Sequence, residues 1–134
     1  MKKLNERGAV AAEFALLLPV LLLILFGIME FGFLMYGREV VTNATREGAR
    51  AGIIAATPPV SIGAMQTVVL GYLPGTGVSP ASITFGPGVC CGGTGTPVTV
   101  AVTYNYPWLI PYIPSLFNLP SPFPIPISVT MLHE

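Results

Sequence analysis

Residues 7–27 read RGAVAAEFALLLPVLLLILFG, and this stretch decides where the chain can lie. From Phe14 to Met29 every residue is uncharged and most are apolar, and the run extends to Gly37 if Glu30 is tolerated. Twenty-four helical residues rise about 36 Å, which is enough to cross a hydrocarbon core of about 30 Å. The sequence therefore predicts one membrane-spanning helix near the N-terminus.

The composition limits what the remainder of the chain can do. The protein has 134 residues, of which 52% are hydrophobic and only 9% are charged, and its formal net charge is zero. Residues 51–133 contain no Asp, Glu, Lys or Arg. A nucleic-acid-binding domain needs a basic surface, so we expect no nucleic-acid partner. The length fits one membrane anchor and one small domain.

Two residues interrupt the apolar run, Pro19 and Glu30. Proline removes one backbone hydrogen bond, which usually kinks a membrane helix without ending it. Glu30 lies about 100° around the helix from Glu13, so the two acids do not form one site. Glu30 either meets a cation or donor on a partner helix or lies at the outer membrane interface.

The basic residues before the apolar run leave three interpretations. The run could be an ordinary uncut membrane helix, or Lys2, Lys3 and Arg7 could begin a secretory signal peptide. The nearest small-x-small triplet after the run, at residues 49–51, is too far along for signal peptide cleavage. In the third interpretation the cut precedes the run.

That third interpretation rests on the order of the first residues. The leader MKKLNERG, followed by AVAAEF and the apolar helix, resembles the processing site of type IV prepilins. The resemblance implies that a membrane peptidase cuts between Gly8 and Ala9 and that Glu13 is retained as the fifth residue. A carboxylate at the bilayer centre costs about 2.5–3.5 kcal/mol. Pairing with the new α-amino group of a neighbouring subunit would lower this cost.

Two longer stretches sharpen the resemblance. EFALLLPVLLLILFGIMEFG at 13–32 and NATREGARAG at 43–52 resemble the TadE-like family of the Flp/Tad pilus apparatus. These pilin-like proteins, called pseudopilins, have a basic leader, a Glu-Phe-Ala-Leu start, a proline in the helix, an acidic residue near its end and a later Arg-x-Gly-Ala-Arg segment. The resemblance implies assembly roles for Glu13, Phe14 and Glu30. It implies as partners the membrane, other pilin-like subunits, Tad assembly proteins and the prepilin peptidase.

The segment after the apolar run continues as a helix with small residues on one face. These residues recur at spacings of three and four, which lets another helix approach closely. They are Ala44, Gly48, Ala51 and Ala55. Together with Arg46 and Arg50 they contact either the rest of the same monomer or a second subunit.

The last part of the chain, residues 57–134, is predicted to form a small α+β head. Thr57-Pro58-Pro59 fits the start of a short helix that ends near Pro74-Gly75. Its predicted apolar positions are Ile62, Met65, Val68, Val69, Tyr72 and Leu73. We expect a brief strand at 79–85 and two further strands, within TPVTVAVTYNYP at 96–107 and IPISVTML at 125–132, where apolar residues alternate. The predicted inward face of the second strand contains Val98, Val100, Val102, Tyr104 and Tyr106.

A proline-rich segment separates the last two strands. Seven prolines lie between Pro107 and Pro126, so this region is predicted to be a long connection and not a central strand. It either covers the sheet as a flap or presents an exposed apolar surface to pilus partners or other envelope proteins.

The head offers few groups for chemistry. Adjacent Cys90 and Cys91 could form a vicinal disulfide, two free thiols or an intermolecular bridge, and we expect no metal site. Outside the N-terminal helix the titratable acid-base groups are His133 and Glu134 at the chain end. We therefore expect no enzymatic activity, no cofactor and no small-molecule substrate.

These observations predict a leader at 1–8, a membrane-spanning and extended helix at 9–56, and an α+β head at 57–134 that contains the proline-rich loop 107–126. The favoured function is a minor pseudopilin of a Tad/Flp-type pilus or secretion machine, processed by a prepilin peptidase. It would cross the cytoplasmic membrane once, with the N-terminus inside and the head outside. The alternatives are a filament-forming pilin in an extracellular pilus and an unprocessed single-pass envelope protein whose head binds a partner protein.

Overall fold

The computed structural model describes residues 2–54, 60–89 and 94–133, with side chains from Gly8 onward. The elements in chain order are α1 (Lys2–Ile53), α2 (Ile62–Gly71), the 3₁₀ helix η1 (Pro80–Ser82), β1 (Ile83–Phe85), β2 (Pro97–Tyr106), α3 (Tyr112–Phe117) and β3 (Phe123–Leu132). One long helix, a short second helix and three antiparallel strands confirm the predicted α+β class. The chain divides into two compact units, residues 1–33 and residues 34–134.

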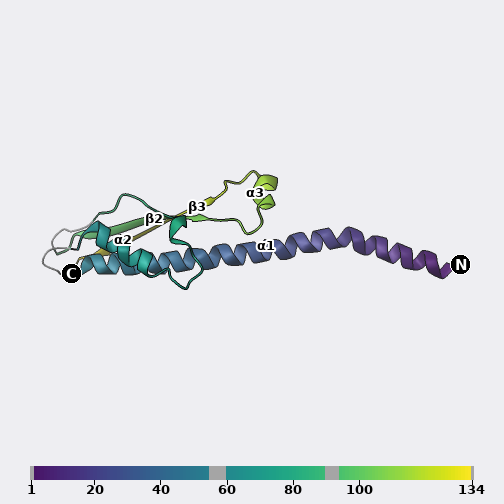
Figure 1. Ribbon diagram of the computed structural model, residues 1–134, viewed down its shortest axis with the longest axis horizontal. Coiled ribbons are helices and arrows are strands. Elements are labelled where there is room, and N and C mark those ends of the chain that lie inside the picture. Colours follow the sequence, from purple (N-terminus) through teal and green to yellow (C-terminus); the bar gives the residue numbers. More distant parts are fainter. Residues whose placement is uncertain (1, 55–59, 90–93, 134) are drawn as a thin grey trace. The chain divides into compact units, whose positions relative to one another are not determined.

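The first unit consists of the N-terminal part of α1, drawn in purple in Figure 1. Leucine and alanine dominate this segment and favour a helix, and Pro19 lies inside it without ending it. None of the residues from Gly8 to Met29 is buried. In the described part of the chain, α1 is the one helix long and apolar enough to cross a membrane, with a mean hydropathy of 2.6 over its most apolar window.

The second unit contains the sheet, whose strands are ordered β1-β2-β3 and are antiparallel throughout. β2 is the central strand, and all ten of its residues pair with β3, from Pro97 opposite Leu132 to Tyr106 opposite Phe123. β1 pairs with only three residues of β2, so one edge of the sheet is short. β3 forms the other, longer edge.

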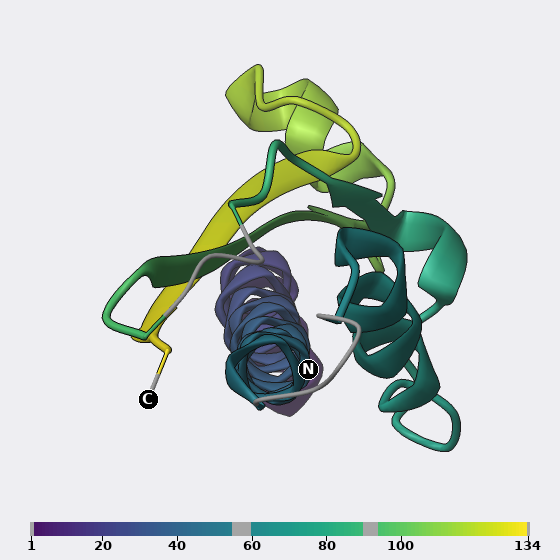
Figure 2. The ribbon, with the colours of Figure 1, turned by 90° about the vertical axis from the view of Figure 1, so that its left-hand side faces the viewer.

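The core of this unit lies on one face of the sheet. The predicted alternation in β2 is confirmed, because the five residues of its predicted inward face are all buried, whereas the residues between them are exposed or partly buried. Figure 2 shows α2 beside α1 on the same side of the curved sheet. The buried core residues are Val41, Ala44, Ala49, Met65, Val69, Leu73, Val78, Ile83, Val98, Val100, Val102, Tyr104, Tyr106, Ile125 and Ile127.

The second helix begins later than predicted. Its N-cap is Ser61, whose Oγ accepts a hydrogen bond from the Ala64 backbone N–H at 3.2 Å, whereas residues 57–59 lie outside the described part. Of its six predicted apolar positions, Met65, Val69 and Leu73 are buried, and the remaining three are only partly covered or exposed. A helix that packs on one side only needs this single i, i+4, i+8 stripe.

The strand predicted at 79–85 is shorter than expected. Its first half forms η1, where the Ser79 Oγ accepts a hydrogen bond from the Ala81 N–H at 3.3 Å and Pro80 occupies the first turn. A serine cap followed by proline favours a helical turn over extended backbone. Only Ile83–Phe85 forms the strand.

The proline-rich segment at 107–126 was predicted to be a loop throughout. The structure shows that it contains α3 and the beginning of β3. Pro114 lies in the first turn of α3, where the missing N–H of proline has no helical partner to lose. β3 includes Pro124 and Pro126, which an edge strand tolerates. The last strand therefore begins at Phe123, two residues before its predicted start at Ile125.

Candidate assembly site

The predicted processing site lies within the first turns of α1. Gly8 and Ala9 are both exposed, and a Cβ added to Gly8 would meet no heavy atom within 4 Å. Glycine in a helix costs about 1 kcal/mol relative to alanine, so the helix is locally weakened at this position. Cleavage between Gly8 and Ala9 remains a prediction.

Glu13 and Phe14 also lie on the exposed surface of the first unit, and Phe14 is 61% exposed. Ala9 and Glu13 are four positions apart, so they share one helix face at a separation of about 6 Å. After a cut at Gly8, the α-amino group of Ala9 and the Glu13 carboxylate would therefore lie one turn apart. In two staggered neighbouring helices the same pair of groups can meet between chains.

Glu30 differs from the apolar side chains around it. It is 4% exposed, whereas Ile28 is 66% exposed and Phe31 is 63% exposed. A buried carboxyl group requires a hydrogen-bonding partner or a counter-charge. The two predicted roles of Glu30, at a partner helix and at the outer interface, remain predictions.

The helix face from Gly37 to Gly52 is closely packed against the head. A Cβ added to Gly37 would lie 2.7 Å from the Tyr104 ring, and one added to Gly52 would lie 2.8 Å from Val98. At Gly48 the added atom would overlap the Val69 side chain. Glycine at these three positions lets α1 approach α2 and β2 within ordinary van der Waals contact.

The segment REGAR at 46–50 divides into two parts with different surroundings. Gly48 and Ala49 are buried, while Arg46 and Arg50 are exposed one helical turn apart. Ala44 is buried as well. The small residues thus pack within the monomer, and the two arginines remain accessible for another molecule.

The other predicted members of the small-residue stripe behave less clearly. Ala51 is partly buried, and Ala55 lies outside the described residues. The structure adds members that the sequence prediction missed, namely Val41, Thr45, Ala49 and Gly52. The sequence contains the pattern that identifies them, because residues at positions 37, 41, 44, 45, 48 and 52 lie on one face of a helix.

The opposite face of α1 holds the charges of the second unit. Five charged residues lie within about half of the helix circumference. All are exposed: Arg38, Glu39, Arg46, Glu47 and Arg50. Since residues 51–133 contain no Asp, Glu, Lys or Arg, this face concentrates the charge of the head unit.

Two tyrosines link α1 to the head. The Tyr36 hydroxyl donates a hydrogen bond to the Thr76 carbonyl oxygen at 3.0 Å. Tyr104 is 4% exposed and lies beside Gly37, and burial raises the pKa of its phenol above the usual value of 10. The neutral phenol is therefore the form that fits this packed position.

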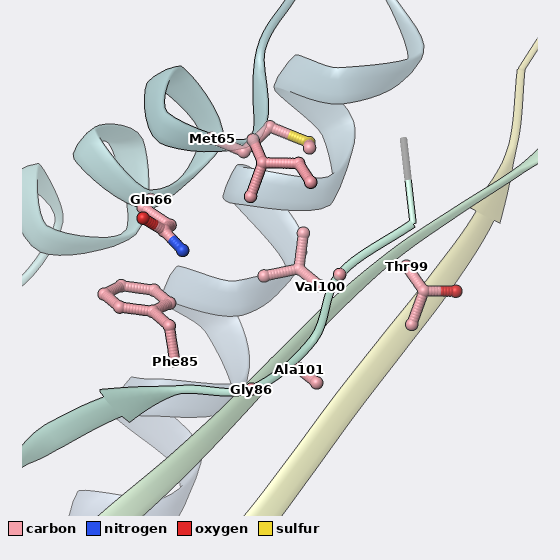
Figure 3. A pocket seen from close by; sticks show the side chains of 9 residues that line it. Met65, Gln66, Phe85, Gly86, Thr99, Val100 and Ala101 are labelled. Atoms are coloured by element: carbon pink, nitrogen blue, oxygen red, sulfur yellow. The ribbon is translucent and has the colours of Figure 1, made fainter. Parts of the chain in front are cut away.

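A small pocket lies between α2 and the sheet (Figure 3). Its walls include Met65, Phe85 and Val100, and Figure 3 shows the Gln66 amide near Phe85. The pocket has room for about one water molecule. Within the described residues no three His, Cys, Asp or Glu side chains cluster as metal ligands. Cys90 and Cys91 lie outside the described residues.

Part of the chain matches a known protein family. Residues 8–50 match the family described as TadE-like protein. The matched region includes the predicted cut site, the apolar run and REGAR, and it confirms the resemblance predicted from the sequence. Comparisons with curated proteins and with solved structures give no significant match.

Proposed function

We propose that this chain is a minor pseudopilin, a pilin-like structural component of a Tad-type pilus or secretion machine. The observation that carries the proposal is the coincidence of two features in one segment. Residues 8–50 match the TadE-like family, and the same residues form most of a helix long and apolar enough to cross a membrane. These two features together support membership of a membrane-bound Tad system.

Processing by a prepilin peptidase is part of the proposal. Cleavage after Gly8 would remove the basic leader and leave Ala9 as the new N-terminus. The exposed position of Gly8 and the Glu13 carboxylate four residues after Ala9 support this step. The amino group so created is the natural partner for a carboxylate that otherwise lies at a membrane edge.

The decisive experiment is the intact mass of the protein purified from the membrane of cells that contain the peptidase. We expect a mass that lacks the first eight residues, and we expect Gly8→Leu to retain them. Gly27→Leu is the matched control, because an added Cβ meets nothing within 4 Å at either glycine. A chain that keeps its leader with Gly8 intact would contradict processing.

The orientation of the chain is also proposed. The basic leader stays in the cytoplasm, the helix crosses the inner membrane once, and the head lies outside. We propose that the head acts by binding and not by catalysis, because residues 51–133 contain no Asp, Glu, Lys or Arg, and their single histidine, His133, lies at the end of the chain with only Glu134 beside it in the sequence as a second acid-base group. Other pilin-like subunits and Tad assembly proteins are the proposed partners, with the exposed Arg46 and Arg50 available to them.

A further inference from the structure

The connection between β2 and β3 exposes an unusual amount of apolar surface. We call residues 107–122 the α3 loop, and this loop contains no charged residue. Its large exposed side chains, with their exposed fractions, are Leu109 (54%), Tyr112 (81%), Leu116 (69%), Phe117 (60%) and Leu119 (39%). Contiguous exposed apolar surface of this kind usually marks a site of contact.

The loop is well anchored at its base, so the exposed side chains do not result from missing internal contacts. The Trp108 Nε1–H donates a hydrogen bond to the Pro120 carbonyl oxygen at 2.9 Å, which closes the loop. The Trp108 ring packs edge-to-face between Tyr106 and Phe123, with centroid distances of 6.0 Å to each. The Leu119 N–H caps α3 at the Pro114 carbonyl oxygen at 2.8 Å. The base of the loop is thus held by hydrogen bonds and ring contacts, while the side chains on its outer side are apolar and exposed.

The contacts of β2 with α1 show at which end of the second unit the α3 loop begins. Val98 lies beside Gly52 and Tyr104 lies beside Gly37, so β2 runs antiparallel to α1. The two separations agree, at about 20 Å along the strand and about 22 Å along the helix. Tyr106, two residues further, therefore lies near the Leu34 end of this unit. Figure 1 likewise shows α3 at the end of β2 and β3 away from the C-terminus.

The Leu34 end of the unit is where the apolar run joins it. A helix that enters a bilayer at Phe14 needs about 20 residues to cross the hydrocarbon core, and so it leaves near residue 33. The lipid surface would therefore lie at the end of the head from which the α3 loop emerges. Exposed charge in the second unit begins only at Arg38.

We propose that the α3 loop binds the membrane surface, with Tyr112, Leu116 and Phe117 inserted at the boundary between headgroups and acyl chains. Tyrosine and tryptophan favour this boundary, and short amphipathic elements enter it by about 5–10 Å. The uncharged loop fits lipid chains better than it fits a partner recognised through charge. The proposal rests on the membrane insertion of α1 in the proposed function, but it requires neither processing nor pilus assembly.

The test uses the full chain with Cys90→Ser and Cys91→Ser, reconstituted in phosphatidylcholine and phosphatidylglycerol vesicles. An environment-sensitive fluorophore is attached separately at Leu116→Cys, at Leu22→Cys in the apolar run and at Leu132→Cys. Leu132 is the matched control, because it is an equally exposed leucine at the opposite end of β3, 65% exposed against 69% for Leu116. Acyl-chain bromines then quench the fluorophores that lie in the membrane.

We expect quenching at Leu116 to reach at least about half of that at Leu22 and to exceed that at Leu132 several-fold. The proposal is overturned if Leu116 is unquenched while Leu22 is quenched, or if Leu116 and Leu132 are quenched equally. If the environment of the fluorophore at Leu116 becomes apolar only at high protein-to-lipid ratios, the loop binds a second copy of the chain and not lipid. That result also overturns the proposal. If the fluorophore at Leu22 is not quenched, α1 is not inserted in the membrane. That result would contradict both the proposed function and the loop proposal.

Discussion

The two halves of α1 differ in the size of their side chains and in what those side chains contact. The half before Leu34 carries large apolar residues around its circumference, and they are exposed, as Leu16 is at 77%. The half from Gly37 to Gly52 buries a face of glycine, alanine, threonine and valine. A helix that is apolar all round needs an apolar surrounding, whereas small residues allow another element to approach. One helix thus combines an exposed half that is apolar enough to cross a membrane with a half that packs into the core of a domain.

The largest expected effect concerns Glu13, an exposed acid in the half of α1 before Leu34. We expect Glu13→Gln to leave the membrane level and processing unchanged while it removes cross-links to pilus partners. Removing one partner of a charge pair at low dielectric costs about 3–5 kcal/mol, and this loss would fall on association alone. Quantitative cross-linking in membranes measures it.

The matched control for Glu13→Gln is Glu39→Gln, which changes an exposed acid of the same helix beyond the apolar run. It should leave cross-linking close to that of the wild type. Cross-linking that is equally strong in Glu13→Gln and wild type would make Glu13 an ordinary interfacial residue.

The next effect tests the packed half of the helix. Gly48→Leu should lower the free energy of unfolding of the head by about 3 kcal/mol or more, because overpacking a filled site forces backbone shifts. The added Cβ alone would overlap Val69 and lie 3.1 Å from the Met65 carbonyl oxygen. Denaturant unfolding in detergent, followed by the fluorescence of Trp108, measures the change.

Gly27→Leu provides the comparison in the exposed half, where an added Cβ meets nothing within 4 Å. It should leave head unfolding unchanged. Equal stability of Gly48→Leu and Gly27→Leu would mean that α1 does not pack against the head as described.

The smallest effect concerns pH and Tyr104. Burial raises the pKa of this phenol above 10, so the folded state retains the proton at pH values where the unfolded state releases it. The stability contributed by the neutral phenol is therefore complete below pH 10 and is lost as the pH rises further. In Tyr104→Phe the free energy of unfolding should fall less steeply above pH 10 than in the wild type. Parallel curves for the two proteins would contradict a buried phenol.

The sequence predicted the elements with strong periodicity well. The alternation from Val98 to Tyr106 identified β2 and its buried face, because one face of the sheet meets the core and the other does not. The apolar run and the glycines of α1 likewise predicted a helix with a spanning part and a packing part. The TadE-like resemblance depended on the same residues and was confirmed by the match at 8–50.

The sequence predicted local boundaries less well, because short-range capping decides them. Ser61 caps α2 through the Ala64 N–H, and no apolar pattern distinguishes Ser61 from Thr57 in advance. α3 was missed because prolines suggest extended chain, although Pro111 and Pro114 both occupy positions where a helix tolerates them.

The sequence identified residues of the candidate site but only partly predicted what each residue contacts. Ala44, Gly48, Arg46 and Arg50 were grouped together, since spacing alone does not say which face of a helix meets its own domain. The structure separates them, because the two small residues are buried and the two arginines are exposed. The roles of Gly8, Glu13 and Glu30 depend on a peptidase and on other subunits, and so they remain predictions.

The prolines of β3 have a consequence for how copies of this chain can meet. Pro124 and Pro126 pair with Asn105 and Thr103 of β2, and alternate residues of a strand direct their N–H groups to the same side. Because the pairing with β2 is complete, the missing N–H groups are those that would point away from the sheet. An additional strand therefore finds no donors along this part of the edge. These two prolines therefore protect this part of the β3 edge against pairing with a strand of another molecule.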